Sequence, residues 1–210
     1  MPDQSHPDKA VIFDVGGVLM HMDWKEYDRF GVERGLPERE WLRILHQTDE
    51  FNAWQTGAGS EEDYQQSILD GVREHIGDRA EAFVTEWFHQ PPGRHEPNIE
   101  MAQALIEAGY TVGVLSNAGP DLRDRIDENL GRKVDWHDLV VSAEVGLAKP
   151  DHAIYHLVME RLSLRPEHCF FIDDIKVNIA AAQEVGWTAH RFKGDYAALQ
   201  ADLRNHGYDW

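Results

Sequence analysis

Four polar positions in this sequence could share one chemical task. Asp14 follows directly after an apolar run, as do the pair Ser116-Asn117 and the pair Asp173-Asp174, and Lys149 lies in a loop shortly after a fourth apolar run. Three carboxylates brought together would repel one another unless a cation neutralised them. Oxygen ligands without cysteine or histidine suit Mg²⁺. The lysine, the hydroxyl and the amide could hold the oxygens of a phosphate ester.

Asp14 is the side chain that could attack such an ester. A carboxylate nucleophile would form an acyl phosphate that water then cleaves, while the metal and Lys149 stabilise charge on the transferring group. Gly16 and Gly17 follow Asp14 and would let the backbone approach a ligand closely. Taken singly, each residue also has an ordinary interpretation: an acid in a loop, acids at a helix N-terminus, or an exposed lysine.

The elements that must position these residues are the strands of a parallel sheet. Apolar runs over residues 10–13, 111–115, 139–142, 169–172 and 187–192 predict strands, and helical periodicity separates them. This alternation predicts an α/β fold with a doubly wound, Rossmann-like parallel sheet. The polar residues would then meet at one rim, because the carboxyl ends of parallel strands share an edge of the sheet.

A helical segment interrupts the alternation between residues 21 and 95. Ser60-Glu61-Glu62-Asp63 resembles a capping box that opens one of its helices, and little in the segment is typical of a strand. We therefore predict an α/β core domain of residues 1–20 and 96–210, with residues 21–95 inserted as a helical cap.

Several finer predictions concern the ends of helices. Pro37 stands where a first helical turn tolerates proline, and Asn98 is predicted to be the N-cap of the helix that ends at Gly109. The loop Gly57-Ala58-Gly59 is predicted to join two helices of the cap. Trp54, just before it, either packs inside the cap or faces the active site.

The four polar positions resemble the motifs of the haloacid dehalogenase-like (HAD) hydrolase superfamily. The motifs are Asp14-Val15-Gly16-Gly17-Val18, Leu115-Ser116-Asn117, Lys149-Pro150, and Phe171-Ile172-Asp173-Asp174 followed by Asn178. The resemblance spans the whole chain, and the insertion between the first two motifs is similar to that of the subgroup with an α-helical cap. Within that subgroup the chain resembles bacterial sugar-phosphate phosphatases of the α-glucose-1-phosphatase type.

The resemblance implies a role for each matched residue. Asp14 would be the nucleophile and a metal ligand, Gly16 would offer its backbone carbonyl to Mg²⁺, and Lys149 would bridge the nucleophile and the phosphate. For the other motif residues it implies substrate binding by Ser116 and Asn117, metal binding by Asp174 and Asp173, and ordering of the metal loop by Asn178.

One departure from the family pattern lies at Gly16. Most phosphatases of the superfamily carry a second aspartate there as general acid and base, and losing such a group commonly costs ~10²–10⁴-fold in rate. Three consequences follow as alternatives. The substrate has a good leaving group, such as an anomeric sugar phosphate; or Asp23, His21 or a cap residue replaces the acid; or the protein is a poor catalyst.

The leading hypothesis is a Mg²⁺-dependent phosphatase that hydrolyses a small phosphorylated metabolite, preferably a sugar phosphate, through an aspartyl-phosphate. One alternative is a metal-independent 2-haloacid dehalogenase. That branch also lacks the second aspartate, but it does not keep a paired-acid motif such as Asp173-Asp174. The other alternative is a catalytically weak binding or scaffold protein on the HAD fold, suggested only by Gly16.

Composition limits the partners of this chain. Its hydrophobic content of 42% is that of a globular protein, and its formal net charge of -18 disfavours binding to nucleic acid and to anionic membranes. A single cysteine, Cys169, excludes an internal disulfide and fits a reducing compartment. The N-terminal residues do not resemble a targeting signal, and no apolar run reaches the length of a membrane span. We expect a cytoplasmic protein that acts on a small phosphate ester.

Overall fold

The computed structural model describes residues 6–90 and 93–210, so residues 1–5, on which part of the targeting prediction rests, lie outside the described residues. A five-stranded parallel sheet has the order β3-β2-β1-β4-β5. Its strands are β1 (His6–Phe13), β2 (Tyr110–Ser116), β3 (Asp138–Val141), β4 (Cys169–Asp173) and β5 (Thr188–Arg191). The predicted α/β class is confirmed. The sheet is doubly wound, because the chain extends it first on one side of β1 and then on the other.

Strand β1 lies at the centre of the sheet, and its apolar residues serve both faces. Val11 and Phe13 pack into one hydrophobic cluster, whereas Ala10 and Ile12 pack into another, and all four are fully buried. Alternate residues of a strand point to opposite faces. A strand covered on both faces therefore needs an apolar residue at every position, which is the pattern that predicted it.

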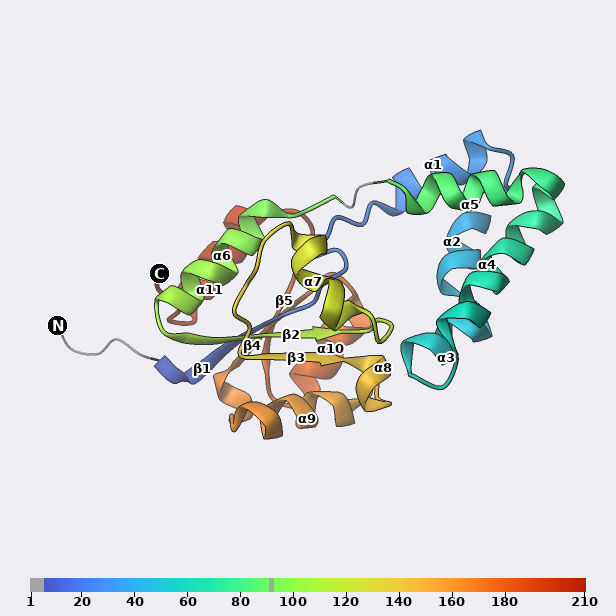
Figure 1. Ribbon diagram of the computed structural model, residues 1–210. Helices are drawn as coiled ribbons and strands as arrows, with labels where there is room; N and C mark the ends of the chain where they lie inside the picture. The colour runs from blue at the N-terminus through green and yellow to red at the C-terminus, as the bar shows by residue number, and fades with distance from the viewer. Residues whose placement is uncertain (1–5, 91–92) are drawn as a thin grey trace.

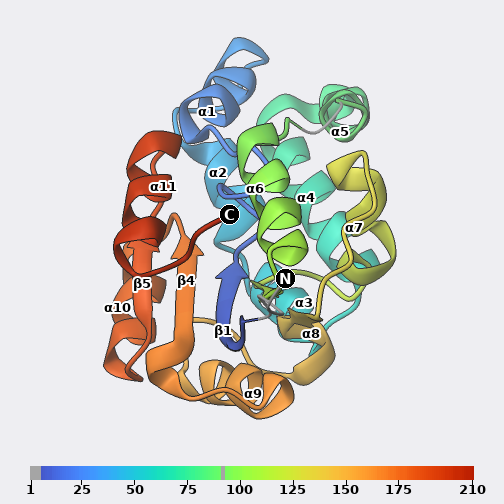
Figure 2. The ribbon, with the colours of Figure 1, turned by 90° about the vertical axis from the view of Figure 1, so that its left-hand side faces the viewer.

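Helices cover both faces of the sheet (Figures 1 and 2). The cluster that contains Val11 and Phe13 is closed by α6 (Glu96–Glu107), α7 (Leu122–Leu130) and α11 (Tyr196–Asn205). The opposite cluster is closed by α9 (His152–Leu162) and α10 (Lys176–Glu184). A short helix, α8 (Ser142–Val145), follows β3. In the described part of the chain, no helix combines the length and the apolar character that crossing a membrane requires.

Five helices between β1 and α6 form a group with a hydrophobic cluster of its own. They are α1 (Trp24–Glu33), α2 (Glu40–His46), α3 (Asp49–Gln55), α4 (Glu61–Ile76) and α5 (Ala80–Phe88). The rings of Trp41 and Phe83 meet edge to face at 4.9 Å inside this cluster. Figure 1 shows the group to the right of the sheet, with α3 beside α8. The division into core and cap at residues 21–95 stays a prediction, which this separate cluster favours.

Two predicted helix ends differ from the structure. Helix α6 begins at Glu96, not after Asn98, which lies inside the helix and is buried. The side-chain amide of Asn98 donates to the carbonyl of Val18 at 2.7 Å. Its role is therefore to hold the loop after β1 and not to cap a helix. Pro37 precedes α2, which begins only at Glu40 after an intervening turn.

Candidate active site

The carboxyl ends of three strands bring the predicted site residues to one rim of the sheet. Asp14 directly follows β1, Ser116 is the last residue of β2 and Asp173 is the last residue of β4. Lys149 reaches the same place from the loop after α8. All four are buried, at 4–6% exposure for Ser116, Lys149 and Asp14 and 0% for Asp173. The motifs far apart in the sequence thus converge on one point.

Lys149 is held between two carboxylates. Its Nζ lies 2.9 Å from Oδ1 of Asp14 and 2.7 Å from Oδ2 of Asp173, and it donates to the carbonyl of Leu115 at 2.9 Å. Burial disfavours the charge on Lys149, but Asp14 and Asp173 together raise the pKa of its ammonium group above the ordinary value. The lysine therefore stays charged beside Asp14, where a phosphate oxygen would need a positive partner.

Asp173 uses both of its oxygens within the protein. Oδ1 accepts from the backbone N–H of Ile175 at 2.7 Å, and the side-chain amide of Asn178 lies 3.1 Å from Oδ2. Together with the ion pair to Lys149, these contacts hold the carboxylate in place. The geometry makes Asp173 an anchor for Lys149 and for the loop that Asn178 orders.

Asp174 occupies space that a glycine leaves open. A Cβ atom at Gly17 would stand 2.6 Å from Cγ of Asp174, and Gly17 has a φ of +73°, which side chains rarely adopt. A side chain at this position would strain the backbone and would push the carboxyl group of Asp174 aside. The second glycine of the first motif is therefore explained by the approach of the Asp174 carboxyl group.

Asp14, Asp173 and Asp174 each offer a carboxylate oxygen, and these oxygens lie within 4.8 Å of one another. Burial raises the pKa of Asp14 to about 7, against the opposing effect of Lys149. Burial and the nearby charge of Asp173 raise the pKa of Asp174 to about 6. Carboxylates that are costly to ionise, and that are hard oxygen ligands, fit a divalent cation such as Mg²⁺.

Asn117 acts on the backbone of Lys149. Its amide nitrogen donates to the carbonyl of Lys149 and its amide oxygen accepts from the N–H of the same residue, both at 2.8 Å. The side chain of Asn117 thereby fixes the loop that carries the lysine, a contact that the sequence did not reveal. Asn117 and Ser116 also line the cavity above Asp14.

The space beside Gly16 is filled by another part of the chain. A Cβ atom at Gly16 would lie 2.6 Å from Sδ of Met22, a residue of the segment that leads to α1. Of the residues considered as replacements for the missing acid, Asp23 caps α1 through hydrogen bonds to the N–H groups of Lys25 and Glu26. Neither Asp23 nor His21 is among the described residues that line the cavity above Asp14.

The cavity above Asp14 measures about 450 Å³ and is closed on its far side by α1–α5. Its walls include seven aromatic side chains that sequence reasoning mostly missed: Trp24, Tyr27, Phe51, Trp54, Tyr64, Trp87 and Phe88. Trp54 combines both predicted roles, because it stacks on Tyr64 at 4.7 Å within the cap and also lines the cavity. The only signal in the sequence was the number of aromatic residues in the helical segment.

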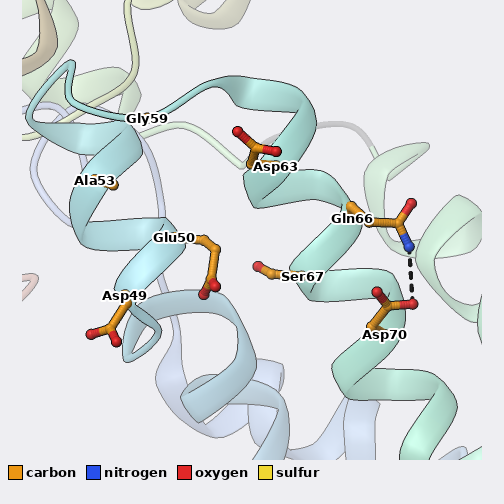
Figure 3. A pocket seen from close by; sticks show the side chains of 8 residues that line it. All are labelled: Asp49, Glu50, Ala53, Gly59, Asp63, Gln66, Ser67 and Asp70. Atoms are coloured by element: carbon orange, nitrogen blue, oxygen red, sulfur yellow. Dashed lines mark hydrogen bonds between the residues drawn. The ribbon is translucent and has the colours of Figure 1, made fainter.

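A second hollow, between α3 and α4, is acidic (Figure 3). Asp63 accepts from Ser60, and Asp70 accepts from Gln66 and Arg73, so these carboxylates have partners within α4 and its N-cap. The hollow holds none of the motif residues. We assign the chemistry to the cavity above Asp14.

Two curated proteins resemble this chain over most of their length. A phosphorylated carbohydrates phosphatase of Thermotoga maritima is 25% identical over 194 residues, covering 85% of this chain and 82% of that protein. Phosphatase MT3486 of Mycobacterium tuberculosis is 29% identical over 195 residues, covering 86% and 85%. The chain also matches the bifunctional epoxide hydrolase 2 of rat at 28% identity, but it spans only 20% of that protein's length.

Among solved structures, the HAD family enzyme BT-2542 of Bacteroides thetaiotaomicron, in complex with magnesium and inorganic phosphate, has the same fold. The TM-score is 0.66 at 23% identity, with 89% of this chain and 95% of that chain covered. The family profile described as haloacid dehalogenase-like hydrolase matches residues 9–186. Fold, motifs and profile agree, and the chain belongs to the haloacid dehalogenase-like hydrolase family.

Proposed function

We propose that this hydrolase is a Mg²⁺-dependent phosphatase that acts on a small phosphate monoester through an aspartyl-phosphate on Asp14. The observation that supports it best is the placement of Lys149, whose Nζ lies 2.9 Å from Asp14 and 2.7 Å from Asp173. An ammonium held beside a nucleophilic carboxylate can bind an oxygen of the transferring phosphoryl group. The two related phosphatases favour the same reaction.

The steps assigned to the chain follow from these contacts. Asp14 attacks phosphorus, the bond from phosphorus to the leaving alcohol breaks, and an acyl phosphate forms on Asp14. Lys149 stabilises the charge on the phosphoryl oxygens. Water then attacks phosphorus, which releases phosphate and frees the carboxylate of Asp14. Because Gly16 offers no acid, the leaving oxygen takes its proton from water.

Asp14, Asp174 and the backbone carbonyl of Gly16 are the groups we assign to Mg²⁺. When bound, the cation supplies charge that offsets the carboxylates and the phosphoryl group during transfer. We assign Asp173 an anchoring role for Lys149, because its oxygens already have three partners in the protein. Ser116 is assigned to the phosphoryl group, and Asn117 to the positioning of Lys149.

Three further expectations belong to this proposal. The name of the Thermotoga maritima relative favours a sugar phosphate as the substrate, whereas the aromatic walls of the cavity favour the ester of a less polar alcohol. A cytoplasmic location is proposed on the single cysteine, Cys169, which is buried. The formal net charge of -18 argues against nucleic acid as a partner.

The test is phosphate release from a panel of phosphorylated metabolites, measured with Mg²⁺ and with EDTA. We expect turnover only with Mg²⁺, and loss of turnover in Asp14→Asn. Asp124→Asn, at an exposed position of α7, is the matched control and should keep full activity. Release of halide from a 2-haloacid in EDTA would instead favour a dehalogenase, and full activity of Asp14→Asn would refute the assignment.

A further inference from the structure

The cavity above Asp14 has a charged floor. The charged side chains that line it are Asp14, Lys149 and Asp174, and all three come from the carboxyl ends of the sheet or the loop beside it. This floor matches a phosphate group with its cation. Among the described residues that line the cavity, no second cluster of charge is available for any other ionic group of a substrate.

The roof of the same cavity is aromatic. Helices α1–α5 contribute the seven rings named above, together with Leu45, and among the described residues they contribute no lysine, arginine, aspartate or glutamate to the lining. A fixed charge on the alcohol half of a substrate would thus lie against apolar walls without a counter-ion, which is costly. The roof therefore selects against amines, second phosphates and sugar acids.

Most polar atoms of the roof are already used or neutral. The hydroxyl of Tyr64 donates to the carbonyl of Leu45 at 2.9 Å, and the side-chain amide of Gln55 donates to Asn52 at 3.1 Å. Burial lowers the pKa of His46 to about 4, so its ring is neutral at pH 7. Nε2 of His46 and Nε1 of Trp54 have no partner in the described structure, but both atoms are themselves buried, so neither presents an accessible hydrogen-bonding group to a ligand.

Apolar side chains also gather at the mouth of the cavity. The described chain exposes five large hydrophobic residues, and three of them line this cavity: Trp24 at 39%, Phe88 at 55% and Ile175 at 43% exposure. An exposed apolar patch beside a pocket is typical of a binding surface. The apolar lining thus continues from the interior to the point where a substrate would enter.

We infer that the substrate is the phosphate monoester of an uncharged, predominantly apolar alcohol, with its phosphate on the charged floor and its apolar part against the aromatic roof. This inference rests on the proposed phosphatase function and narrows its substrate class. A sugar with several hydroxyl groups fits less well, because burying each hydroxyl without a partner costs free energy. The cavity of about 450 Å³ lies in the range of small-molecule sites.

A series of linear alkyl phosphates from methyl to octyl tests the inference. Each buried methylene contributes about 0.8 kcal/mol, which corresponds to a factor of about 4 in kcat/KM. We expect kcat/KM to rise by about that factor per carbon until the cavity is filled, and glucose phosphates to be slower than hexyl phosphate. A series that is flat while every ester is hydrolysed would overturn the apolar site and leave the phosphatase intact.

Variants of two aromatic residues at the mouth of the cavity test whether the apolar lining causes the dependence on chain length. In Trp24→Ala and in Phe88→Ala, the total rise in kcat/KM from methyl to octyl phosphate should be at least several-fold smaller than in the wild type. Val32→Ala is the matched control, because Val32 is an exposed hydrophobic residue of the same helix as Trp24, at 47% exposure, and does not line the cavity. An unchanged dependence in both mouth variants would overturn the inference. If neither these esters nor any member of the panel of phosphorylated metabolites is hydrolysed with Mg²⁺, the proposed function itself fails.

Discussion

Gly16→Asp restores the acid that most phosphatases of the superfamily carry at this position. It tests whether Met22 is the reason that an acid does not fit there. A Cβ atom at Gly16 would stand 2.6 Å from Sδ of Met22, so an aspartate there collides with the thioether. Inserting atoms into a filled site commonly costs 1–3 kcal/mol. Met22 is a flexible side chain that also lines the cavity, so the cost should lie at the low end of this range. We expect Gly16→Asp alone to lower the free energy of unfolding by about 1 kcal/mol and to add little or no activity.

Removing Met22 at the same time should change the outcome. Met22→Ala takes away the thioether and leaves room for a carboxyl group beside Asp14. A correctly placed general acid contributes ~10²–10⁴-fold when the leaving group is poor. We expect the double variant to gain at least about 10²-fold in kcat for an alkyl phosphate relative to Met22→Ala. For a phosphate ester whose leaving group is already a stable anion, the gain should be small.

The assay is a double-mutant cycle. The four proteins are compared in kcat with one poor and one good leaving group, and in urea unfolding, so that catalytic and structural coupling are read separately. The reasoning is refuted if Gly16→Asp by itself gains the full rate, because Met22 would then not block the position. It is also refuted if the double variant accelerates both esters equally, because the new group would then not be protonating the leaving oxygen.

Two further predictions concern stability. Asp173→Asn removes one of the two carboxylates that pair with Lys149 and leaves the other, Asp14, so it should lower the free energy of unfolding by about 1–3 kcal/mol. Asp174→Asn should not lower it. Urea unfolding without divalent metal checks both variants, and equal losses would contradict the distinct roles. Burial lowers the pKa of His46 from 6.5 to about 4, so the unfolded chain takes up a proton between those pH values and the folded chain does not. The contribution of His46 to stability, which is fully present above pH 6.5, should therefore fall by about 3 kcal/mol as the pH drops to 4. Because the raised pKa values of Asp14 and Asp174 act in the opposite direction over the same range, the measurement is the difference in stability between the wild type and His46→Asn, which should change by that amount.

The residues of the floor could be predicted from the sequence because two general rules determine where they lie. Strands buried on both faces leave apolar runs that are visible in the sequence, and the parallel arrangement places the residue after each run on one rim. Asp14, Ser116 and Asp173 follow from these rules. Lys149 needed the family resemblance as well, since it lies in a loop away from any strand end.

Other features depend on contacts that no local pattern encodes. Asn98 has the side chain of an N-cap, but its hydrogen bond to Val18 links positions far apart in the sequence, and Pro97 at the start of α6 provides the actual helix opening. The roof of the cavity was equally hidden. The sequence shows that the helical segment contains many aromatic residues. Whether Trp54 faces its own helices or the active site depends on how the helices pack, which the sequence does not show.

Two features restrict the choice of substrate: the lack of an acid at Gly16 and the apolar roof of the cavity. Met22 fills the space beside Gly16, and the roof adds no carboxylic acid among the described residues. The ring of His46, with its pKa lowered to about 4, is a poor proton donor at pH 7. The departing oxygen must therefore carry its own negative charge until water reaches it. Among esters that fill the cavity equally well, those whose alcohol is the stronger acid should turn over faster, and a variant that supplies the acid should reduce that difference.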